Sequence, residues 1–535
     1  MKAHLMYKDK DFHVEDPTLS FNRPRWSKTD NPELPSREIN LTQDLDLAML
    51  FDAMALGDAF LFEVSKRAVL LSLDDPEAIR YRQEILADCI TQPDIIREMY
   101  AIATEAAVEE RKIRSYGFFS KSPSGILPNA VKALELFMEL LKRLRRITDE
   151  HAGGFRSEGL TAFFTMLKKE LDDEYFLTID EHLARLKFRD GMLISAMLGK
   201  GNKGAGYMLR TPGQRQRQRL KERIGIGPRS SYYYDIHPRD VTGGRVLREL
   251  TDRGLNLVAN ALTQSKDHIL SLFTMLRSEL GFYVSCLNLY EHLVEKDEPT
   301  CTPVPLPWGL PVLSFHGLYD ICLTLRTEGR VVGNAANADG KPLVMITGAN
   351  SGGKSTFLRS IGLAQMMMQC GMFVGAESFR ANVCDRLFTH FIREEDATMI
   401  SGKLDEELSR MSALADEMTS RSIVLFNESF AATNEREGSE IAGQIARALM
   451  DSGVKVFFVT HLFSLAECFY LKSVDSALFL RAERGEDGRR TFKLVEGQPL
   501  PTSFGEDLFK RLGGWSTVPT PGHPAGDGSR ALEHP

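Results

Sequence analysis

The stretch LVMITGANSGGKST, residues 343–356, decides how the rest of the chain is interpreted. An apolar run long enough for one buried strand precedes a glycine-rich loop, and a helical pattern follows over residues 355–369. Residues 348–355 match G-x-x-x-x-G-K-S in full, the pattern of a phosphate-binding P-loop. Glycines let successive backbone N–H groups turn inward around a phosphate without Cβ clashes. The alternative is a glycine-rich turn that binds nothing.

The P-loop pattern predicts a role for each of its side chains. Lys354 is expected to reach the β- and γ-phosphates of ATP, and Ser355 to ligate Mg²⁺. The N-terminus of the following helix adds a partial positive charge. The predicted ATP-binding residues are Gly348, Ala349, Asn350, Ser351, Gly352, Gly353, Lys354, Ser355 and Thr356.

The composition is that of an ordinary soluble globular protein of several domains. The chain has 535 residues, of which 43% are hydrophobic and 26% charged. Its formal net charge is −7, so any nucleic-acid-binding surface must be local. Residues 1–11 do not resemble a secretory signal, and no apolar run is long enough to span a membrane. The seven cysteines form no C-x-x-C pair, which indicates reduced thiols in a cytoplasm without zinc or disulfides.

The first part of the chain is predicted to be mainly α-helical. Residues 1–40 are polar and contain four prolines, so an extended arm is expected, followed by a helical lever or core domain over residues 41–300. Asp75-Pro76 is a predicted helix start. A long helical pattern covers residues 245–295, where Gly254 and Gly281 are candidates for a kink or a break. The proline-rich residues 295–311 are the predicted domain boundary.

Residues 174–240 differ from the helices on either side. They contain many glycines and β-like runs at 176–179, 192–195 and 231–234. Between residues 185 and 230 there are twelve basic and two acidic residues, in a chain whose total charge is negative. Such a concentration is typical of a surface that contacts a phosphate backbone, because each Lys or Arg displaces counterions. A solvated loop is the other interpretation. The candidate DNA-binding residues are Lys200, Lys203, Arg210, Arg215, Arg217 and Arg219.

Residues 301–515 are predicted to form an α/β domain around the P-loop. Apolar runs at 343–347, 423–426 and 454–460 lack polar alternation, as expected of parallel strands covered on both faces. Helical patterns at 404–418 and 441–450 lie between them. A hairpin is expected to follow around residues 485–488. The proline- and glycine-rich tail, residues 516–535, is predicted to be disordered.

Two side chains at predicted strand ends are candidates for ATP hydrolysis. The strand at 423–428 ends in Asn427-Glu428, where a Walker B motif ordinarily has Asp-Glu. The Asp of that motif holds Mg²⁺ and the Glu orients or deprotonates the attacking water. Asn427 can still accept a hydrogen bond from metal-bound water but adds no charge, and Glu428 is the predicted catalytic base. His461 follows the next strand and is a candidate γ-phosphate sensor, although a histidine there is also compatible with a structural role.

These motifs together resemble the ATPase domain of the MutS family. The resemblance is carried by residues 347–356, Asn427-Glu428, Thr433-Asn434, Glu437-Gly438, Thr460-His461 and Thr502-Ser503-Phe504-Gly505. It covers residues 331–512 closely and extends more loosely to 44–82 and 255–293, which are similar to the family's helical lever. The basic insert falls where MutS-like proteins have their DNA clamp. The resemblance implies an ABC-type, Mg²⁺-dependent ATPase that binds DNA as a homodimer in DNA mismatch repair or a related repair or recombination process.

The sequence departs from the family pattern at three places. The S-x-F-x-x-E segment that contacts the partner subunit's nucleotide is matched by residues 401–408, but Gly402 stands where Ser is expected and Leu404 where Phe is expected. Ser401, Gly402 and Glu407 are the expected contacts, with Ser401 one residue earlier as the alternative source of the hydroxyl. Where relatives have an adenine-stacking aromatic, this chain has Val331 or Val332. About 40 residues precede the lever, too few for the usual mismatch-recognition domains. The Phe-x-Glu at residues 137–139 lies in a helical pattern, so we expect packing there and no mismatch wedge.

Two functions remain after the sequence is considered. The first is an ATPase whose turnover is coupled to DNA binding. The second is a pseudo-ATPase, a nucleotide-gated dimerisation scaffold with little turnover, which Asn427 favours. A chromosome ATPase of the SMC type would need a long coiled coil, and no segment sustains heptads over that length.

Overall fold

The computed structural model describes residues 1–17, 38–116, 122–189, 191–210, 235–349, 351–393, 402–473, 476–485 and 489–500. The chain divides into two compact units. The first comprises residues 1–309, 315–331 and 362–383, and the second comprises residues 310–314, 332–361 and 384–535. The protein is therefore multidomain, and both units are built from discontinuous segments. Within the part of the chain that the structure describes, no helix is long and apolar enough to cross a membrane.

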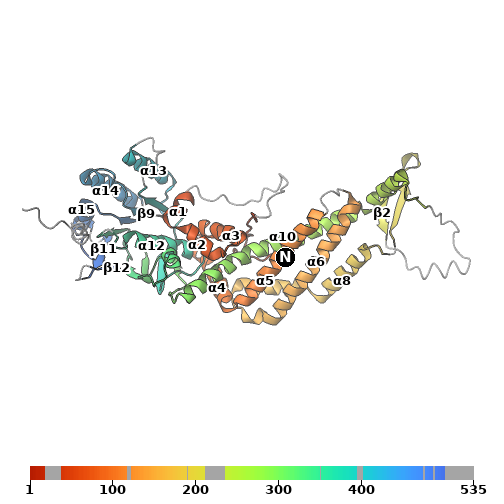
Figure 1. The fold of residues 1–535 in the computed structure, drawn as a ribbon, viewed down its shortest axis with the longest axis horizontal. Coiled ribbons are helices and arrows are strands. Elements are labelled where there is room, and N and C mark those ends of the chain that lie inside the picture. The colour runs from red at the N-terminus through yellow and green to blue at the C-terminus, as the bar shows by residue number, and fades with distance from the viewer. Residues whose placement is uncertain are drawn as a thin grey trace, which may run out of the picture. The chain divides into compact units, whose positions relative to one another are not determined.

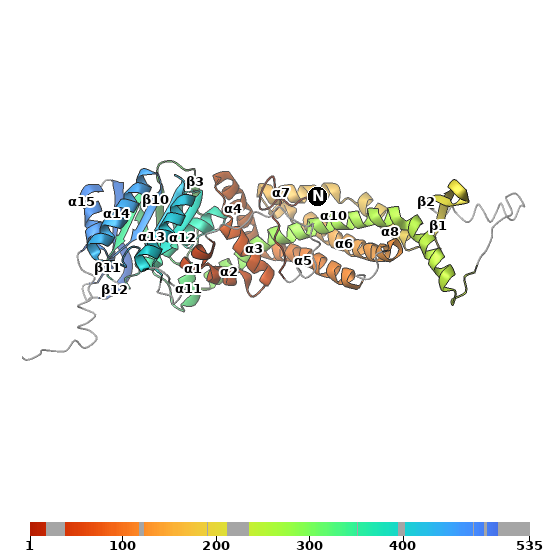
Figure 2. The same ribbon diagram turned by 90° about the horizontal axis from the view of Figure 1, so that it is seen from above.

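The first unit is helical, as the sequence predicts (Figures 1 and 2). Asp75 caps α4 by accepting hydrogen bonds from the backbone N–H groups of Glu77 and Ala78, which confirms the predicted helix start. The helices of this unit are α1 (Glu38–Asp44), α2 (Leu47–Ala55), α3 (Ala59–Leu70), α4 (Pro76–Thr91), α5 (Pro93–Tyr116), α6 (Pro123–His151), α7 (Glu158–Glu170), α8 (Asp173–Leu186), α10 (Val241–Glu295) and α11 (Ile321–Arg326).

The long helix α10 is the centre of this unit, and it runs without a break through both of its predicted weak points (Figure 2). Gly281 is surrounded at ordinary van der Waals distances, whereas a Cβ on Gly254 would lie 2.6 Å from Ile194 Cδ1. The expected break is therefore absent, and Gly254 allows Ile194, in the strand at residues 193–198, to approach the helix closely. Phe137 of α6 is fully buried with its ring centroid 5.6 Å from that of Phe273, which confirms that this Phe-x-Glu is packing.

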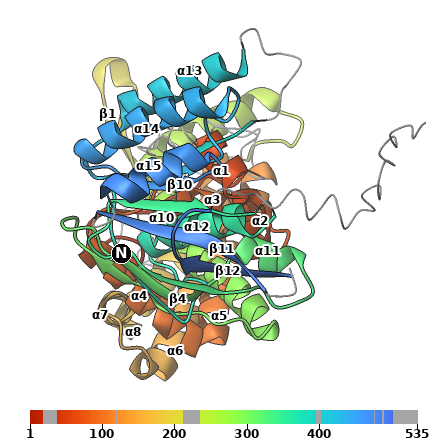
Figure 3. The ribbon, with the colours of Figure 1, turned by 90° about the vertical axis from the view of Figure 1, so that its left-hand side faces the viewer.

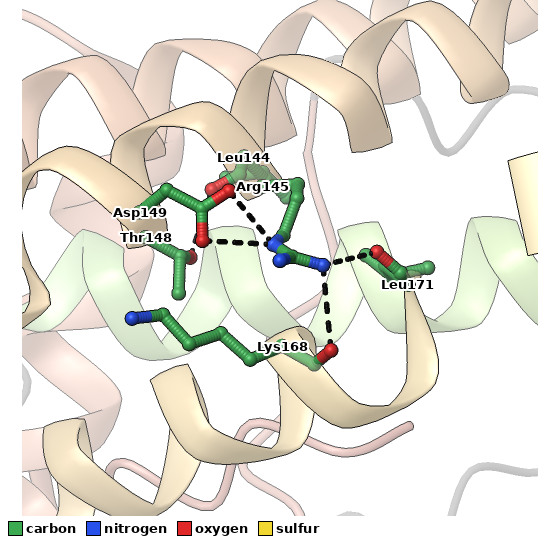
Figure 4. A network of polar contacts seen from close by, with 6 residues as sticks. All are labelled: Leu144, Arg145, Thr148, Asp149, Lys168 and Leu171. Atoms are coloured by element: carbon green, nitrogen blue, oxygen red, sulfur yellow. Dashed lines mark hydrogen bonds and ion pairs between the residues drawn. The ribbon is translucent and has the colours of Figure 1, made fainter. Parts of the chain in front are cut away.

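Arg145 of α6 joins that helix to the end of α7 (Figure 4). Its Nε donates to both carboxylate oxygens of Asp149 at 3.0 Å. Its Nη1 donates to the backbone carbonyls of Lys168 at 3.3 Å and Leu171 at 2.6 Å. The last carbonyls of a helix have no partner within the helix, so the guanidinium both satisfies them and complements the negative end of the α7 dipole.

A β-hairpin follows α8, in the part of the chain where the sequence predicts β-like runs. Strands β1 (Leu193–Leu198) and β2 (Gly204–Arg210) pair in antiparallel fashion and lie beside the first part of α10 (Figures 1 and 2). The strand expected at 192–195 is thus present. The one expected at 176–179 is wrong, because α8 covers those residues with Phe176 and Leu183 buried on one helical face. Residues 231–234 lie outside the described part of the chain.

Residues 1–17 contain no helix or strand but are packed against α10. The carboxylate of Glu279 accepts hydrogen bonds from the backbone N–H groups of Leu5 at 2.6 Å and Phe12 at 3.4 Å. Earlier on the same helix, Arg277 forms a buried ion pair with Asp16 at 2.6 Å. Burial raises the pKa of Glu279 to about 8. This segment is therefore a fixed part of the helical unit.

The second unit contains a six-stranded sheet in the order β12-β11-β6-β10-β9-β8. All neighbours are parallel except β11 and β12, which form the predicted hairpin. Helices α13, α14 and α15 lie over one face and share an apolar core with it (Figure 3). The bounds are β6 (Leu343–Thr347), β8 (Arg386–Phe391), α13 (Lys403–Glu417), β9 (Ser422–Asn427), α14 (Glu435–Asp451), β10 (Lys455–Val459), α15 (Phe463–Ser473), β11 (Ala477–Arg484) and β12 (Arg490–Glu496).

The remaining strands are short, and one of them lies in the proline-rich stretch that is the predicted domain boundary. Strand β3 (Val304–Leu306) pairs in parallel with β7 (Ser378–Asn382), and both belong to the first unit. Strands β4 (Leu313–Leu318) and β5 (Asn334–Asn337) follow β3 in the chain, and α12 (Lys354–Gln369) follows the P-loop.

Candidate nucleotide-binding site

The glycine-rich loop lies at the carboxyl end of β6, between that strand and α12. Gly348 has φ 115° and Gly353 has φ 90°, values that side chains with a Cβ rarely adopt. A Cβ on Gly348 would also lie 2.8 Å from the backbone nitrogen of Ala482, and one on Gly352 would lie 2.8 Å from the Cβ of Ala482. Two of the loop glycines are thus required by the close approach of β11. Asn350 lies outside the described residues.

The side chain of Lys354 is folded into the loop that precedes it. Its Nζ donates to the backbone carbonyls of Gly348 at 2.8 Å and Ala349 at 3.1 Å. Burial lowers the pKa of Lys354, and the nearby Glu428 carboxylate opposes this shift. The loop therefore holds a largely buried cation at the start of a helix, where an anion is stabilised by charge and by backbone N–H groups.

The loop and the end of β9 meet through one hydrogen bond. The hydroxyl of Ser355 donates to the side-chain carbonyl oxygen of Asn427 at 2.8 Å. Two neutral oxygens thus lie side by side, with the Glu428 carboxylate next along the chain. Mg²⁺ is bound by oxygen ligands, usually with one or two carboxylates and substrate phosphates. The donor set fits an Mg²⁺ ion that takes most of its charge compensation from a nucleotide. The described residues contain no cluster of three His, Cys, Asp or Glu side chains that could hold a metal ion.

Glu428 and His461 lie at the same edge of the sheet. His461 Nδ1 is 3.6 Å from Glu428 Oε1, and both side chains are partly exposed. The interaction with His461 lowers the pKa of Glu428, burial opposes the shift, and Lys354 reinforces it. Glu428 is therefore ionised at neutral pH. Glu428 follows β9 and His461 follows β10, which are parallel neighbours, so their carboxyl ends meet at this edge; the catalytic roles expected of the two residues stay predictions.

The residues expected to contact a partner subunit differ in their surroundings. Gly402 is exposed immediately before α13, and Ser401 lies outside the described residues. The side chain of Glu407 does not face solvent, because it is buried and its carboxylate accepts a hydrogen bond from the backbone N–H of Phe430. The sequence alone gave no indication of this contact.

Phe492 of β12 is a residue that the sequence analysis missed. It is an exposed aromatic side chain, and its backbone carbonyl lies 3.6 Å from where a Cβ of Gly353 would be. Asn334 holds this strand by accepting a hydrogen bond from Leu494 N at 2.7 Å and donating to Phe492 O at 3.4 Å. Val332 is half-buried. An aromatic residue just after a predicted hairpin turn was the available signal, but its nearness to the P-loop depends on the sheet order.

The candidate DNA-binding residues belong to the first unit. Lys200, Lys203 and Arg210 are exposed on the hairpin of β1 and β2, and Arg210 donates to the Ser195 hydroxyl at 2.9 Å. The same hairpin exposes apolar side chains, including Leu198 at 78%. The other three candidates, Arg215, Arg217 and Arg219, lie outside the described residues.

Comparison with known proteins finds MutS-related domains in two separate stretches of the chain. Residues 74–296 match the MutS2 N-terminal domain, and residues 344–511 match MutS domain V. The DNA mismatch repair protein MutS of Thermotoga maritima is 34% identical over 174 residues, covering 32% of this chain and 22% of that protein. The protein of the same name from Lactobacillus helveticus is 31% identical over 278 residues, covering 48% of this chain and 32% of that protein. The chain thus spans about a fifth to a third of these relatives.

Proposed function

Because the chain belongs to the MutS family, we propose that it is an ATPase that couples nucleotide binding and hydrolysis to DNA binding in DNA repair or recombination. The observation that carries this proposal is the hydrogen bond between Ser355 and Asn427. It brings the P-loop and the Walker B position into one site, as binding of a nucleotide with Mg²⁺ requires. These relatives are DNA mismatch repair proteins, which supports the choice of DNA as the partner.

The P-loop residues bind the phosphates in this proposal. The loop N–H groups and the N-terminus of α12 would surround the β-phosphate, and Lys354 would exchange its two carbonyl contacts for phosphate oxygens. Ser355 and Asn427 would hold Mg²⁺, which when bound neutralises charge on the phosphates. Phe492, an exposed aromatic side chain near Gly353, would cover the base in place of the aromatic missing at Val331 or Val332.

Glu428 directs hydrolysis by positioning water. Its lowered pKa makes it a weak base but keeps it ionised, so a carboxylate oxygen accepts a hydrogen bond from the attacking water and orients it. His461, 3.6 Å from that carboxylate, would hold its orientation and would contact the γ-phosphate. The exposed start of α13 at Gly402 would contact a second copy of the chain, so the active form is a homodimer.

A pseudo-ATPase scaffold is the second candidate function, and Asn427 is the observation that favours it. The site has one carboxylate where a typical Walker B strand has two, so Mg²⁺ is held with less negative charge. Both functions include ATP binding, and turnover separates them.

The test is a steady-state ATPase assay with and without DNA on the parent and on Glu428→Gln. We expect turnover in the parent and a loss of about 100-fold or more in Glu428→Gln, which keeps the shape of the side chain but removes its charge. Glu467→Gln, an exposed change on α15, is the matched control. Lys354→Ala should abolish binding of a fluorescent ATP analogue, whereas Lys472→Ala should not.

The possible results assign the function clearly. ATP binding without turnover in the parent would establish the scaffold function. If Asn427→Asp then gave turnover, the missing carboxylate would be its cause. Turnover that survives Glu428→Gln would remove Glu428 from its proposed role. Unchanged ATP binding in Lys354→Ala would overturn the P-loop assignment itself.

A further inference from the structure

The turn after β9, which carries Glu428, has an unusual backbone. Glu428 has φ 57° and Phe430 has φ 63°, so two of three successive residues are in the left-handed region although neither is glycine. Such conformations are unfavourable for residues with a Cβ and persist where surrounding contacts hold them. The position of the Glu428 carboxylate therefore depends on the groups that hold this turn.

A different element holds each residue of the turn. The backbone N–H of Glu428 donates to Val459 O of β10 at 2.9 Å. The Ser429 hydroxyl lies 2.7 Å from His390 Nδ1 and 2.6 Å from His390 O, both of β8. The backbone N–H of Phe430 donates to the Glu407 carboxylate of α13 at 2.5 Å. The turn is thus fixed from two strands and one helix.

His390 contacts both the turn and α13. Its Nε2 is 3.1 Å from the backbone carbonyl of Glu407, and its ring stacks on Phe430 with centroids 5.2 Å apart. Burial, reinforced by Arg410, lowers the pKa of His390 to about 4, so the ring is neutral near pH 7. The Glu407 backbone carbonyl can only accept, so the ring donates to it from Nε2 and Nδ1 is an acceptor; the one hydroxyl proton of Ser429 is then shared between Nδ1 and the His390 carbonyl oxygen.

The turn is also in close contact with α14. A Cβ on Gly438 would lie 2.4 Å from the carbonyl oxygen of Phe430, so the helix backbone rests directly on the turn. The turn cannot move toward α14 without displacing that helix. A shift of α13 would therefore be taken up by the turn and by the Glu428 side chain that it carries.

We propose that Glu407 and His390 are positioning residues that tie α13 to the turn bearing Glu428. This rests on the proposed ATPase function, and it changes the expected role of Glu407 from a contact to the partner's nucleotide to a contact within its own subunit. The start of α13 at Gly402 is the part of the helix exposed to a partner. If a dimer closes on that end of α13, the movement of the helix would be passed through Glu407 to the Glu428 carboxylate. Nucleotide binding by one subunit would then control the rate of hydrolysis in the other.

The test compares Glu407→Ala, Glu407→Gln and Ser429→Ala with the exposed control Asp416→Ala on the same helix. We expect Glu407→Ala to lower kcat by about 10- to 100-fold, the size of loss that a small misplacement of a catalytic group produces. The Kd for a fluorescent ATP analogue should stay within about twofold, because the P-loop is untouched. Glu407→Gln keeps an acceptor for Phe430 N–H and should restore most of kcat. Ser429→Ala removes one hydroxyl, leaves the fold intact, and should lower kcat by about three- to tenfold.

Amide hydrogen exchange at residues 428–430 provides a readout that does not need turnover. Glu407→Ala should speed exchange there and Asp416→Ala should not. A parent without turnover would overturn the proposed function, while the exchange result would still decide whether Glu407 holds the turn. Four results would each overturn the inference. The first is unchanged exchange at residues 428–430 in Glu407→Ala, and the second is an equal kcat in Glu407→Ala and Asp416→Ala. The others are a Glu407→Gln variant as slow as Glu407→Ala and a parent-like kcat in Ser429→Ala.

Discussion

Glu428 is a carboxylate whose ionisation is set by one neighbour. The contact with His461 is the largest cause of its lowered pKa, and burial works in the opposite direction. A carboxylate with a lowered pKa stays ionised to more acidic pH than an ordinary glutamate. The acid side of the ATPase pH profile should therefore depend on His461, even though Glu428 is the group that titrates.

Replacing His461 by Ala should make the ATPase more sensitive to acid. Without the histidine, the burial effect on Glu428 is opposed only by Lys354, so the pKa of Glu428 rises and the carboxylate becomes protonated at higher pH. The measurement is kcat of the parent and variant between about pH 4 and 8, the range that contains ordinary glutamate and histidine titrations. His461→Gln, which keeps a hydrogen-bond donor, should lie between them. Superimposable acid limbs would show that His461 does not control Glu428.

At the scale of single residues, the sequence predicted the site where the chemistry itself fixes the spacing. Lys354 and Ser355 are adjacent in the P-loop motif, and Asn427, Glu428 and His461 follow apolar runs whose ends meet at one sheet edge. Glu407 and Phe492 could not be assigned in this way. Their contacts come from a helix and a strand that are brought to the site only by tertiary packing.

Among the elements, α10 contains two glycines, Gly254 and Gly281, whose surroundings differ. Glycine lowers helix stability because it has more backbone freedom to lose. At Gly281 the surroundings accept a methyl group, since the nearest atom to a Cβ is 3.5 Å away. At Gly254 they do not, because three atoms of Ile194 lie within 2.9 Å of that position.

Gly281→Ala should stabilise the helical unit and Gly254→Ala should not. We expect a gain of about 0.5–1 kcal/mol at position 281 from the helix propensity of alanine. At position 254 the same gain should be cancelled or reversed by the clash with Ile194. In an Ile194→Ala background the clash is removed, and Gly254→Ala should then stabilise. Thermal unfolding followed by circular dichroism measures all four variants. Equal shifts at both glycines in the parent background would contradict the close approach of β1.

The elements were predicted well where a single periodicity dominates. The parallel strands and the helices between them have clear apolar runs, and β6, β9 and β10 appear as expected. The strand predicted at residues 176–179 was wrong because the prediction relied on composition, and Phe176, Leu177 and Ile179 are apolar residues that suit a strand. The helix forms there because Asp172 caps it and Phe176 is buried on one face with Leu183.

For the molecule as a whole, the distribution of charge matters more than its total. A net charge of −7 repels DNA at long range, while residues 185–230 carry a strong local excess of basic residues. DNA binding at such a site should depend on salt in proportion to the number of phosphates contacted. Lys200 and Lys203 are exposed members of this set.

Replacing Lys200 and Lys203 together by Ala should flatten the salt dependence of DNA binding. Loss of two phosphate contacts should reduce the slope of log K against log salt by up to about 1.8 on duplex DNA, without changing sequence preference. Fluorescence anisotropy of a labelled duplex over a salt series measures the slope. Lys168→Ala with Lys169→Ala, an equal loss of charge on exposed positions of α7, should leave it unchanged. Equal effects from both pairs would mean that only the total charge matters.

The division of the whole chain into two units could not have been predicted from local patterns. The proline-rich residues near 300 suggested a single boundary, yet residues 362–383 belong to the helical unit. One reason is the pairing of β3 with β7, which joins segments that are far apart in the sequence. Composition marks where a chain is irregular, but pairing of distant strands depends on the complete fold.

The contact between residues 1–17 and α10 also constrains how the protein is made. Leu5 is hydrogen-bonded to Glu279, 274 residues later in the chain. At a synthesis rate of about 5–20 residues per second, the ribosome needs roughly 14–55 s between these two residues. During that time the apolar side chains of Leu5, Met6 and Phe12, all buried in the finished protein, have no α10 to pack against. The beginning of the chain is therefore expected to be among the last parts of the helical unit to fold, and a chaperone that binds nascent apolar segments would find its site there.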